Sequence, residues 1–142
     1  VLRGQDGDLR DVLLAGASEK PLSVRDHCLA QGLPLAVKFY YHNSRCGDRR
    51  AIRSIDEPAP TLRISSSRPL PPGYRRHPGD AVTDLKRVRA LTLREAALIH
   101  SFPAAWDWRD VRVVDGWAMV ANAVPPRLGE HLGRALLALQ GK

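Results

Sequence analysis

The chain has 142 residues, with 22 lysines and arginines against 15 aspartates and glutamates, and a formal net charge of +7. This length supports one domain, or a piece of one, with a modest core. No apolar run approaches the roughly 20 residues that span a bilayer, and no signal peptide is visible. We therefore expect no membrane partner and a soluble protein of the cytoplasm.

The charge indicates the class of partner, and the cysteines indicate the cellular compartment. An excess of positive charge favours an anionic partner, although basic surfaces that bind no nucleic acid are also common. The cations are mostly arginines, which suit bidentate contacts to phosphate or guanine better than lysines do. Cys28 and Cys46 have no metal-ligand spacing and give no disulfide framework, so we expect no metal site and a reducing compartment.

The first half of the chain predicts short elements. Residues 9–14 and 23–30 can each form a short helix, the second capped by Ser23. Residues 35–41 have the β-branched and aromatic content of a strand, and residues 51–55 alternate as a second strand.

The segments that follow are less regular. Residues 61–65 alternate again, and the proline-rich residues 66–80 predict an extended, stiff loop rather than a helix.

Positive charge is concentrated in the middle of the chain. Between Arg45 and Arg76 there are eight arginines and three acidic residues. On stiff loops that also carry Ser, Thr and Tyr, this composition suits a grip on a phosphodiester backbone. The alternative is a solvated basic loop with surface ion pairs such as Arg53 with Asp56. The candidate DNA-contact residues are Arg45, Arg49, Arg50, Arg53, Thr61, Arg63, Ser65, Arg68, Arg75 and Arg76.

A capped helix is predicted next. Thr92 and Glu95 have the spacing of a capping box, and Phe102-Pro103 ends the helix. Trp106 and Trp108 fit a packed aromatic anchor better than a platform for base stacking.

Two helices are expected before the C-terminal residues. Residues 111–114 can form a short strand, with a helix over 114–120. Pro125-Pro126 opens a last helix, for which Gly141 is a natural cap. An apolar stripe on that helix must bury against something, and it consists of Leu128, Leu132, Ala135, Leu136 and Leu139.

Three of these stretches together resemble the C-terminal part of DNA (cytosine-5) methyltransferases. The run from Leu91 to Pro103 resembles the ninth motif of that family, and Ala121 to Pro126 resembles the tenth. Residues 56–80 resemble the end of its target-recognition region. The three occur in the family's order over residues 52–139, which makes the resemblance specific.

The resemblance implies an α+β fold in two parts. Residues 1–105 would form a small target-recognition domain of short strands and Pro-rich loops. Residues 106–142 would carry the tenth motif and a C-terminal helix that packs on a separate, Rossmann-like catalytic domain. Asn122 and Ala123 would line the S-adenosylmethionine pocket. Thr92, Arg94 and Glu95 would be the structural residues of the ninth motif, and Arg94 and Glu95 would organise the recognition region from inside.

The family's catalytic residues are absent from this sequence. The resemblance calls for a nucleophilic cysteine in a Pro-Cys setting, a glutamate in Glu-Asn-Val, and a cofactor turn reading Phe-x-Gly-x-Gly, none of which occurs here. It therefore implies no catalytic residue in this chain and no methylation by it alone.

The chain would instead be one half of a split bacterial restriction-modification enzyme, or a fragment of one. It would share S-adenosylmethionine with a catalytic partner that carries the cysteine, bind double-stranded DNA, and associate with the nucleoid. The alternative is an inactive, stand-alone basic DNA-binding or scaffold module derived from such an enzyme.

Three departures from the family pattern are visible. Ala121 stands where the family usually has glycine, which matters if that backbone needs a positive φ. In the ninth motif, Leu98, His100 and Ser101 replace the arginine, the glutamine and the glycine that are usual in the family. The loop from Arg63 to Pro69 also differs from the usual Arg-Gly-Val-Asn-Arg-Pro, which affects the target sequence more than the fold.

Overall fold

The computed structural model describes residues 21–43 and 50–140, and for residues 139 and 140 the backbone alone. The predicted helix over residues 9–14, Arg45, Arg49, Cys46 and Gly141 lie outside the described residues. Residues Leu22–Ala123 form one compact unit, and the C-terminal helix belongs to another. The helices are α2 (Val24–Leu29), α3 (Leu93–Ile99), α4 (Val113–Asn122) and α5 (Pro126–Gln140), with 3-10 turns η1 (Ile64–Ser67) and η2 (Leu85–Arg87).

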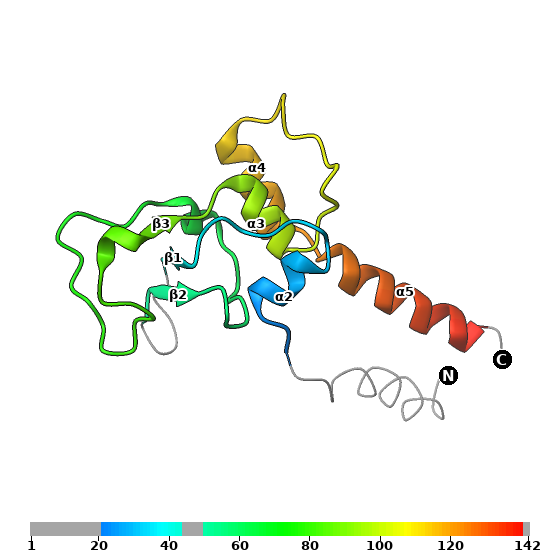
Figure 1. The fold of residues 1–142 in the computed structure, drawn as a ribbon. Helices are drawn as coiled ribbons and strands as arrows, with labels where there is room; N and C mark the ends of the chain where they lie inside the picture. The colour runs from blue at the N-terminus through cyan, green and yellow to red at the C-terminus, as the bar shows by residue number, and fades with distance from the viewer. Residues whose placement is uncertain (1–20, 44–49, 141–142) are drawn as a thin grey trace, which may run out of the picture. The chain divides into compact units, whose positions relative to one another are not determined.

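A small mixed sheet lies at one end of the Leu22–Ala123 unit (Figure 1). Its strands are β1 (Phe39–Tyr41), β2 (Ile52–Ser54) and β3 (Val88–Ala90), in the order β2-β1-β3. β1 pairs with β2 antiparallel and with β3 parallel. The predicted strands over 35–41 and 51–55 are therefore confirmed in shorter form, while β3 was not predicted.

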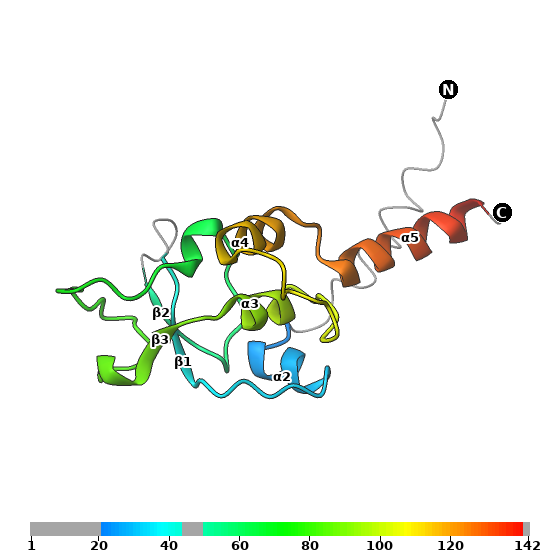
Figure 2. The ribbon, with the colours of Figure 1, turned by 90° about the horizontal axis from the view of Figure 1, so that it is seen from above.

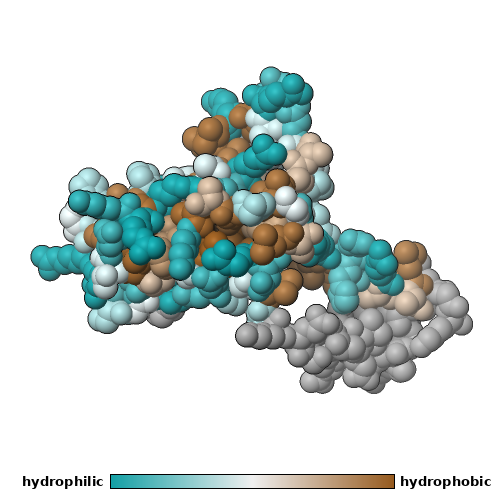
Figure 3. Space-filling model, in the orientation of Figure 1, coloured by the Kyte–Doolittle hydropathy of each residue, from teal (hydrophilic) through white to brown (hydrophobic). Residues whose placement is uncertain are grey.

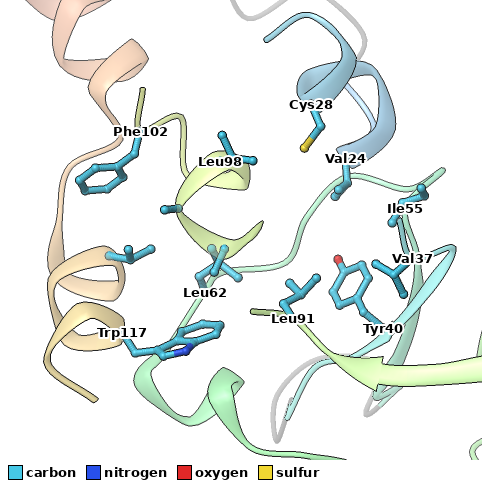
Figure 4. Packing of buried hydrophobic residues seen from close by; sticks show 13 residues of the cluster. Val24, Cys28, Val37, Tyr40, Ile55, Leu62, Leu91, Leu98, Phe102 and Trp117 are labelled. Carbon is cyan, nitrogen blue, oxygen red and sulfur yellow. The ribbon is translucent and has the colours of Figure 1, made fainter. Parts of the chain in front are cut away.

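The core lies between this sheet and the helices. Side chains converge on it from α2, α3, α4 and β1, as Figure 4 shows. Tyr40 and Trp117 are the largest of them, and both are almost completely buried. A layer of helices against one face of a small sheet is an α+β arrangement, as expected from the sequence.

Helices α3 and α4 pack closely at one point. Gly116 on α4 faces Leu93 on α3, and a Cβ built on the glycine would overlap the Leu93 side chain. Helix α2 reaches the same layer through His27 and Gln31, whose side chains hydrogen-bond the Leu98 carbonyl at 2.9 and 3.0 Å. The ninth-motif helix is thus held between α2 and α4.

Two expectations from the sequence are wrong. Residues 61–65 do not form a strand, because Ile64–Ser67 close into the η1 turn with Ser66 buried beneath it. Residues 111–114 do not form one either, since Val113 and Val114 already belong to the first turn of α4. In that turn both valines are exposed, so their β-branched side chains have no neighbouring strand to pack against.

Helix α5 begins and ends close to the predicted positions. Leu128, Leu132 and Leu136 of the predicted stripe are exposed, Ala135 is buried, and the side chain of Leu139 lies outside the described residues. No helix among the described residues is long and apolar enough to cross a membrane.

Candidate nucleic-acid interface

A hollow of about 260 Å³ opens at the end of β1. It is lined by Asn43, Arg63, Ser65 and Arg68, so three of the predicted contact residues meet there. Each of these four side chains carries a hydrogen-bond donor, and none of the described lining residues is acidic. Arginine pairs with the acceptor edge of guanine or with phosphate oxygens, so the hollow is suited to nucleic acid.

The η1 turn, which carries part of the lining of this hollow, is held by a buried polar pair. Ser66 on η1 accepts a hydrogen bond from the Arg63 amide at 3.1 Å, and its hydroxyl lies 3.3 Å from Nδ1 of His42. His42 is only 3% exposed. Burial, with the nearby charges of Arg53 and Arg63, lowers the pKa of His42 to about 4. The ring is therefore neutral at pH 7 and serves as a rigid support between β1 and η1.

Asp80 fixes the proline-rich loop to the sheet. Its carboxylate accepts hydrogen bonds from the amides of Ala51, Ile52 and His77, at 3.2, 3.0 and 2.8 Å. It also accepts one from the Tyr74 hydroxyl at 2.9 Å. Burial alone would raise the pKa of Asp80, but these hydrogen bonds outweigh it and lower the pKa. One carboxylate thus ties the loop to the start of β2.

Tyr74 covers the sheet from the same loop. Its ring meets Tyr41 of β1 edge to face, with centroids 6.1 Å apart. Burial and the bond to Asp80 raise the pKa of Tyr74 to about 12, so it remains a donor at any physiological pH. Tyr74 is thus held by Tyr41 through its ring and by Asp80 through its hydroxyl. These contacts anchor the loop that carries the exposed Arg75 and Arg76.

The remaining predicted arginines differ in their availability. Arg50 donates to both carboxylate oxygens of Glu57, at 3.2 and 2.5 Å, and is half-buried. Arg53 is half-buried on β2, while Thr61 is exposed beside the buried Leu62. The expected surface partner Asp56 is bound by Arg25 at 2.6 Å. Arg50 and Arg53 therefore contribute positive potential beneath the surface rather than free guanidinium groups.

The capping box of α3 is confirmed. Thr92 Oγ1 accepts from the Glu95 amide at 3.2 Å, and Glu95 accepts from the Thr92 amide at 2.8 Å. Arg89 on β3 also donates to both Glu95 oxygens, which joins the helix to the sheet. Burial would raise the pKa of Glu95, but its bonds to Arg89 and Thr92 lower it.

Arg94 is exposed in this chain, and its predicted role in organising the recognition region stays a prediction. It lines a hollow of about 580 Å³ together with Trp106 and Trp108. Both tryptophans pack on Phe102, with ring centroids 5.4 and 5.7 Å away, as expected for an aromatic anchor.

Asn122 and Ala123 lie at the end of α4. Asn122 is exposed, so its amide is open to a ligand. The Ala123 carbonyl is hydrogen-bonded to His100 Nε2 at 2.9 Å, and the Ala123 amide donates to the Met119 carbonyl at 3.0 Å. Only the methyl group of Ala123 is therefore left to contact a ligand. The predicted role of these two residues stays a prediction.

Sequence reasoning missed the residues that support the hollow. Asp80 closes a His-Pro-Gly-Asp turn, and an aspartate at the end of such a turn is a visible signal for backbone capture. Ser66 and His42 gave no signal, because their contact depends on η1 folding back over the end of β1.

Comparison with known proteins identifies the family of the chain. The family model described as C-5 cytosine-specific DNA methylase matches residues 35–138, most of the chain. The chain is 38% identical over 135 residues to Type II methyltransferase M.HgiDI of Herpetosiphon aurantiacus, which covers 95% of the chain and 42% of that protein. It is 38% identical over 121 residues to M.HindV of Haemophilus influenzae, with 84% and 38% covered.

A third relative is more distant, and the matches to all three are partial. M.MthTI of Methanothermobacter thermautotrophicus is 32% identical over 139 residues, which cover 90% of the chain and 42% of that protein. The chain thus spans about two fifths of the length of these curated relatives. No solved structure matches it. On the family match and these relatives, the chain belongs to the C-5 cytosine-specific DNA methylase family.

Proposed function

We propose that this chain is the C-terminal, DNA-recognition and cofactor-lining part of a DNA (cytosine-5) methyltransferase. Together with a catalytic partner it would methylate C5 of cytosine in duplex DNA, with S-adenosylmethionine supplying the methyl group. The observation that carries the proposal is the braced hollow of Asn43, Arg63, Ser65 and Arg68, in a chain of this family.

The bracing matters because recognition needs fixed donors. Arg63 starts the η1 turn and Arg68 follows it directly, so both leave a backbone held by Ser66 and His42. Arginines on a rigid scaffold lose less conformational entropy on binding than arginines on a loose loop. Hydrophilic side chains cover the end of the unit where the sheet and its loops lie (Figure 3). This end of the molecule would face the DNA.

The chemistry would come from the partner. The sequence contains no Pro-Cys pair. Cys28 is completely buried, and burial, with a contribution from Glu95, raises the pKa of its thiol. A buried thiol of raised pKa is a poor nucleophile. We therefore expect no methyl transfer by this chain alone.

Two helices would receive the partner. On α4, Val113, Val114 and Met119 are 64%, 70% and 45% exposed, and apolar side chains reach the surface around its first turn (Figure 3). On α5, the exposed leucines are Leu128, Leu132, Leu136 and Leu137. Repeated exposed apolar side chains on a helix indicate a protein contact. Asn122 ends α4, which would bring it to the shared cofactor site.

Reconstitution with a catalytic chain tests the proposal. The chain is mixed with a methyltransferase chain that carries Pro-Cys, and transfer of labelled methyl from S-adenosylmethionine to mixed-sequence duplex DNA is measured. We expect transfer by the pair and none by either chain alone. The double variant Arg63→Gln/Arg68→Gln should lower kcat/KM by about tenfold or more, because each good arginine contact contributes about 1–3 kcal/mol.

The variant Arg109→Gln/Arg112→Gln is the matched control. It also removes two positive charges, but from exposed arginines that pair with Asp107 and Asp115. Because Arg112 caps α4, whose first turn would meet the partner, the control is compared by the affinity of the chain for duplex DNA. We expect the control to retain that affinity and Arg63→Gln/Arg68→Gln to lose it. Tight DNA binding with no complex and no transfer would overturn the proposal in favour of a stand-alone DNA-binding module.

A further inference from the structure

A second basic hollow lies at the opposite end of the sheet strands. Because β1 and β3 are parallel, the segments that precede them meet at one edge, although they are far apart in the sequence. Lys38 precedes β1, and Lys86 and Arg87 in η2 precede β3. Figure 2 shows η2 and η1, identified by their colours, at opposite ends of the strands. The hollow measures about 250 Å³ and is lined by Ala36, Val37, Lys38, Lys86, Arg87, Val88 and Arg89.

Two of its cations are held in place by one aromatic ring. The guanidinium carbon of Arg87 lies 5.2 Å from the centroid of Phe39, and Lys38 Nζ lies 5.7 Å from it. Phe39 is itself buried, so the ring is a fixed support. Cations placed over an aromatic face are attracted to it and keep part of their hydrogen-bonding capacity for a ligand.

The acidic groups near these cations among the described residues have other hydrogen-bond partners, although the charge of Lys38 also contributes to the lowered pKa of Asp56. Asp56 is bound by Arg25, and Glu95 by Arg89. Asp84 accepts from the backbone amide of Lys86 at 3.1 Å. Among the described residues, Lys38, Lys86 and Arg87 take part in no ion pair. The positive charge of the hollow is therefore available to an anion.

The two hollows lie along β1, and their spacing can be compared with the rise of duplex DNA. Side chains alternate along a strand, so Phe39, Tyr41 and Asn43 share one side of β1 and its extension. Arg87 lies over Phe39, and Tyr74 packs on Tyr41. Asn43 lines the hollow at the end of β1. Five residues separate Lys38 from Asn43, a distance of about 16 Å at about 3.3 Å per residue. That distance corresponds to roughly five base pairs at 3.4 Å each.

We propose that Lys38, Lys86 and Arg87 form a second contact to the same duplex DNA. They would hold its phosphodiester backbone about five base pairs from the hollow lined by Asn43, Arg63, Ser65 and Arg68, here called the η1 hollow. The contact rests on the proposed DNA-recognition function and extends its footprint. We expect it to be independent of base sequence, because Lys38 and Lys86 offer point charges without the planar fork that reads guanine, and the fork of Arg87 lies over Phe39. The second contact would set the register of the first.

The salt dependence of binding tests this contact. The full chain and Lys86→Gln/Arg87→Gln are titrated with a mixed-sequence duplex of about 30 base pairs at several salt concentrations, and the slope of log Kd against log salt is measured. Each lost phosphate contact should reduce the slope by about 0.9, so we expect a reduction of about 1.8 and affinity lower by roughly tenfold. Arg87→Lys keeps the charge over Phe39 and should retain most of the affinity.

The control and the possible outcomes separate this contact from the proposed function. Arg109→Gln/Arg112→Gln removes the same net charge from another part of the unit, and its slope should stay near that of the parent chain. Equal slopes for the two double variants would overturn the second contact alone. A parent chain that shows no salt-dependent DNA binding would overturn the proposed function as well. Because Arg87 covers Phe39, the single variant Lys86→Gln is measured too, and an unchanged slope for it also contradicts the contact.

Discussion

The unit Leu22–Ala123 and helix α5 differ in how far their apolar side chains are buried. In the unit, apolar groups converge on one core, and the polar groups near the sheet bind one another through His42, Ser66 and Asp80. Helix α5 leaves Leu128, Leu136 and Leu137 from 48% to 68% exposed. An apolar side chain gains stability only when something covers it. We infer from the contrast that the unit is stabilised by its own core, whereas the exposed leucines of α5 would be covered by the proposed partner.

Removing a large core side chain should affect the unit far more than a similar change on α5. Trp117→Ala deletes an indole that is 2% exposed, and we expect a loss of about 3–5 kcal/mol in the free energy of unfolding. Leu136→Ala, on α5, should cost less than about 0.5 kcal/mol. Urea unfolding followed by circular dichroism measures both. Similar losses for the two variants would contradict the contrast.

Acid should destabilise the unit through His42. Its pKa is lowered from 6.5 to about 4, so the folded state binds this proton less readily than the unfolded state does. The stabilising contribution of the neutral ring is therefore complete above about pH 6.5 and is lost as the pH falls towards 4. At 1.36 kcal/mol per unit, it is on the order of 3 kcal/mol.

Two histidine variants test the assignment. His42→Gln should flatten the pH dependence of the urea midpoint between pH 6.5 and 4. His131→Gln removes an exposed histidine of α5 and should leave the fall in place. If the flattening follows His131→Gln instead, the support proposed for the η1 hollow is wrong.

Loss of the Asp80 carboxylate should release the proline-rich loop. Asp80→Asn replaces one acceptor oxygen by a donor facing the Tyr74 hydroxyl or backbone amides, and we expect a loss of about 2 kcal/mol. Glu130→Gln on α5 breaks an exposed pair with Arg134 and should cost no more than about 0.5 kcal/mol. Thermal unfolding compares the two, and hydrogen exchange of the Ile52 amide reports the loop directly.

Local patterns predicted the elements that depend on neighbouring residues. The capping box gave the start of α3, and Ser23 gave the start of α2 through its bond to the Asp26 amide. Strand β3 gave no pattern, because Val88–Ala90 has only three residues and pairs in parallel with a strand about fifty residues earlier. Its pairing places Lys38 beside Arg87, so the second basic hollow was equally invisible in the sequence.

The candidate DNA site was predictable in composition but not in geometry. Arg63, Ser65 and Arg68 were identified from charge and resemblance, and the structure brings them together. The engagement of Arg50 by Glu57 could not be read from the sequence, since any of several acids stood within reach. Charge patterns find a basic region, and folding decides which of its cations remain available.

The smallest expected effects concern the two positions where the family usually has glycine. Ser101 follows α3 and has a φ of +65°. The Ser101 amide donates to the Leu98 carbonyl, and the Phe102 amide donates to the Ala97 carbonyl, both at 2.9 Å. These bonds form a Schellman motif, which favours glycine at the left-handed position. Ala121, in contrast, is an interior residue of α4 with an ordinary helical backbone.

Opposite preferences should follow at these two positions. Ser101→Gly and Ser101→Ala both remove the hydroxyl, so their difference isolates the backbone, and the glycine variant should be more stable by about 1 kcal/mol. At position 121, Ala121→Gly should cost about 0.5–1 kcal/mol, because glycine is less stable than alanine within a helix. Urea unfolding of the three variants measures both differences. Equal stability of the two Ser101 variants would mean that the left-handed turn after α3 is not maintained in solution, and the position of Phe102 beneath Trp106 and Trp108 would then need another explanation.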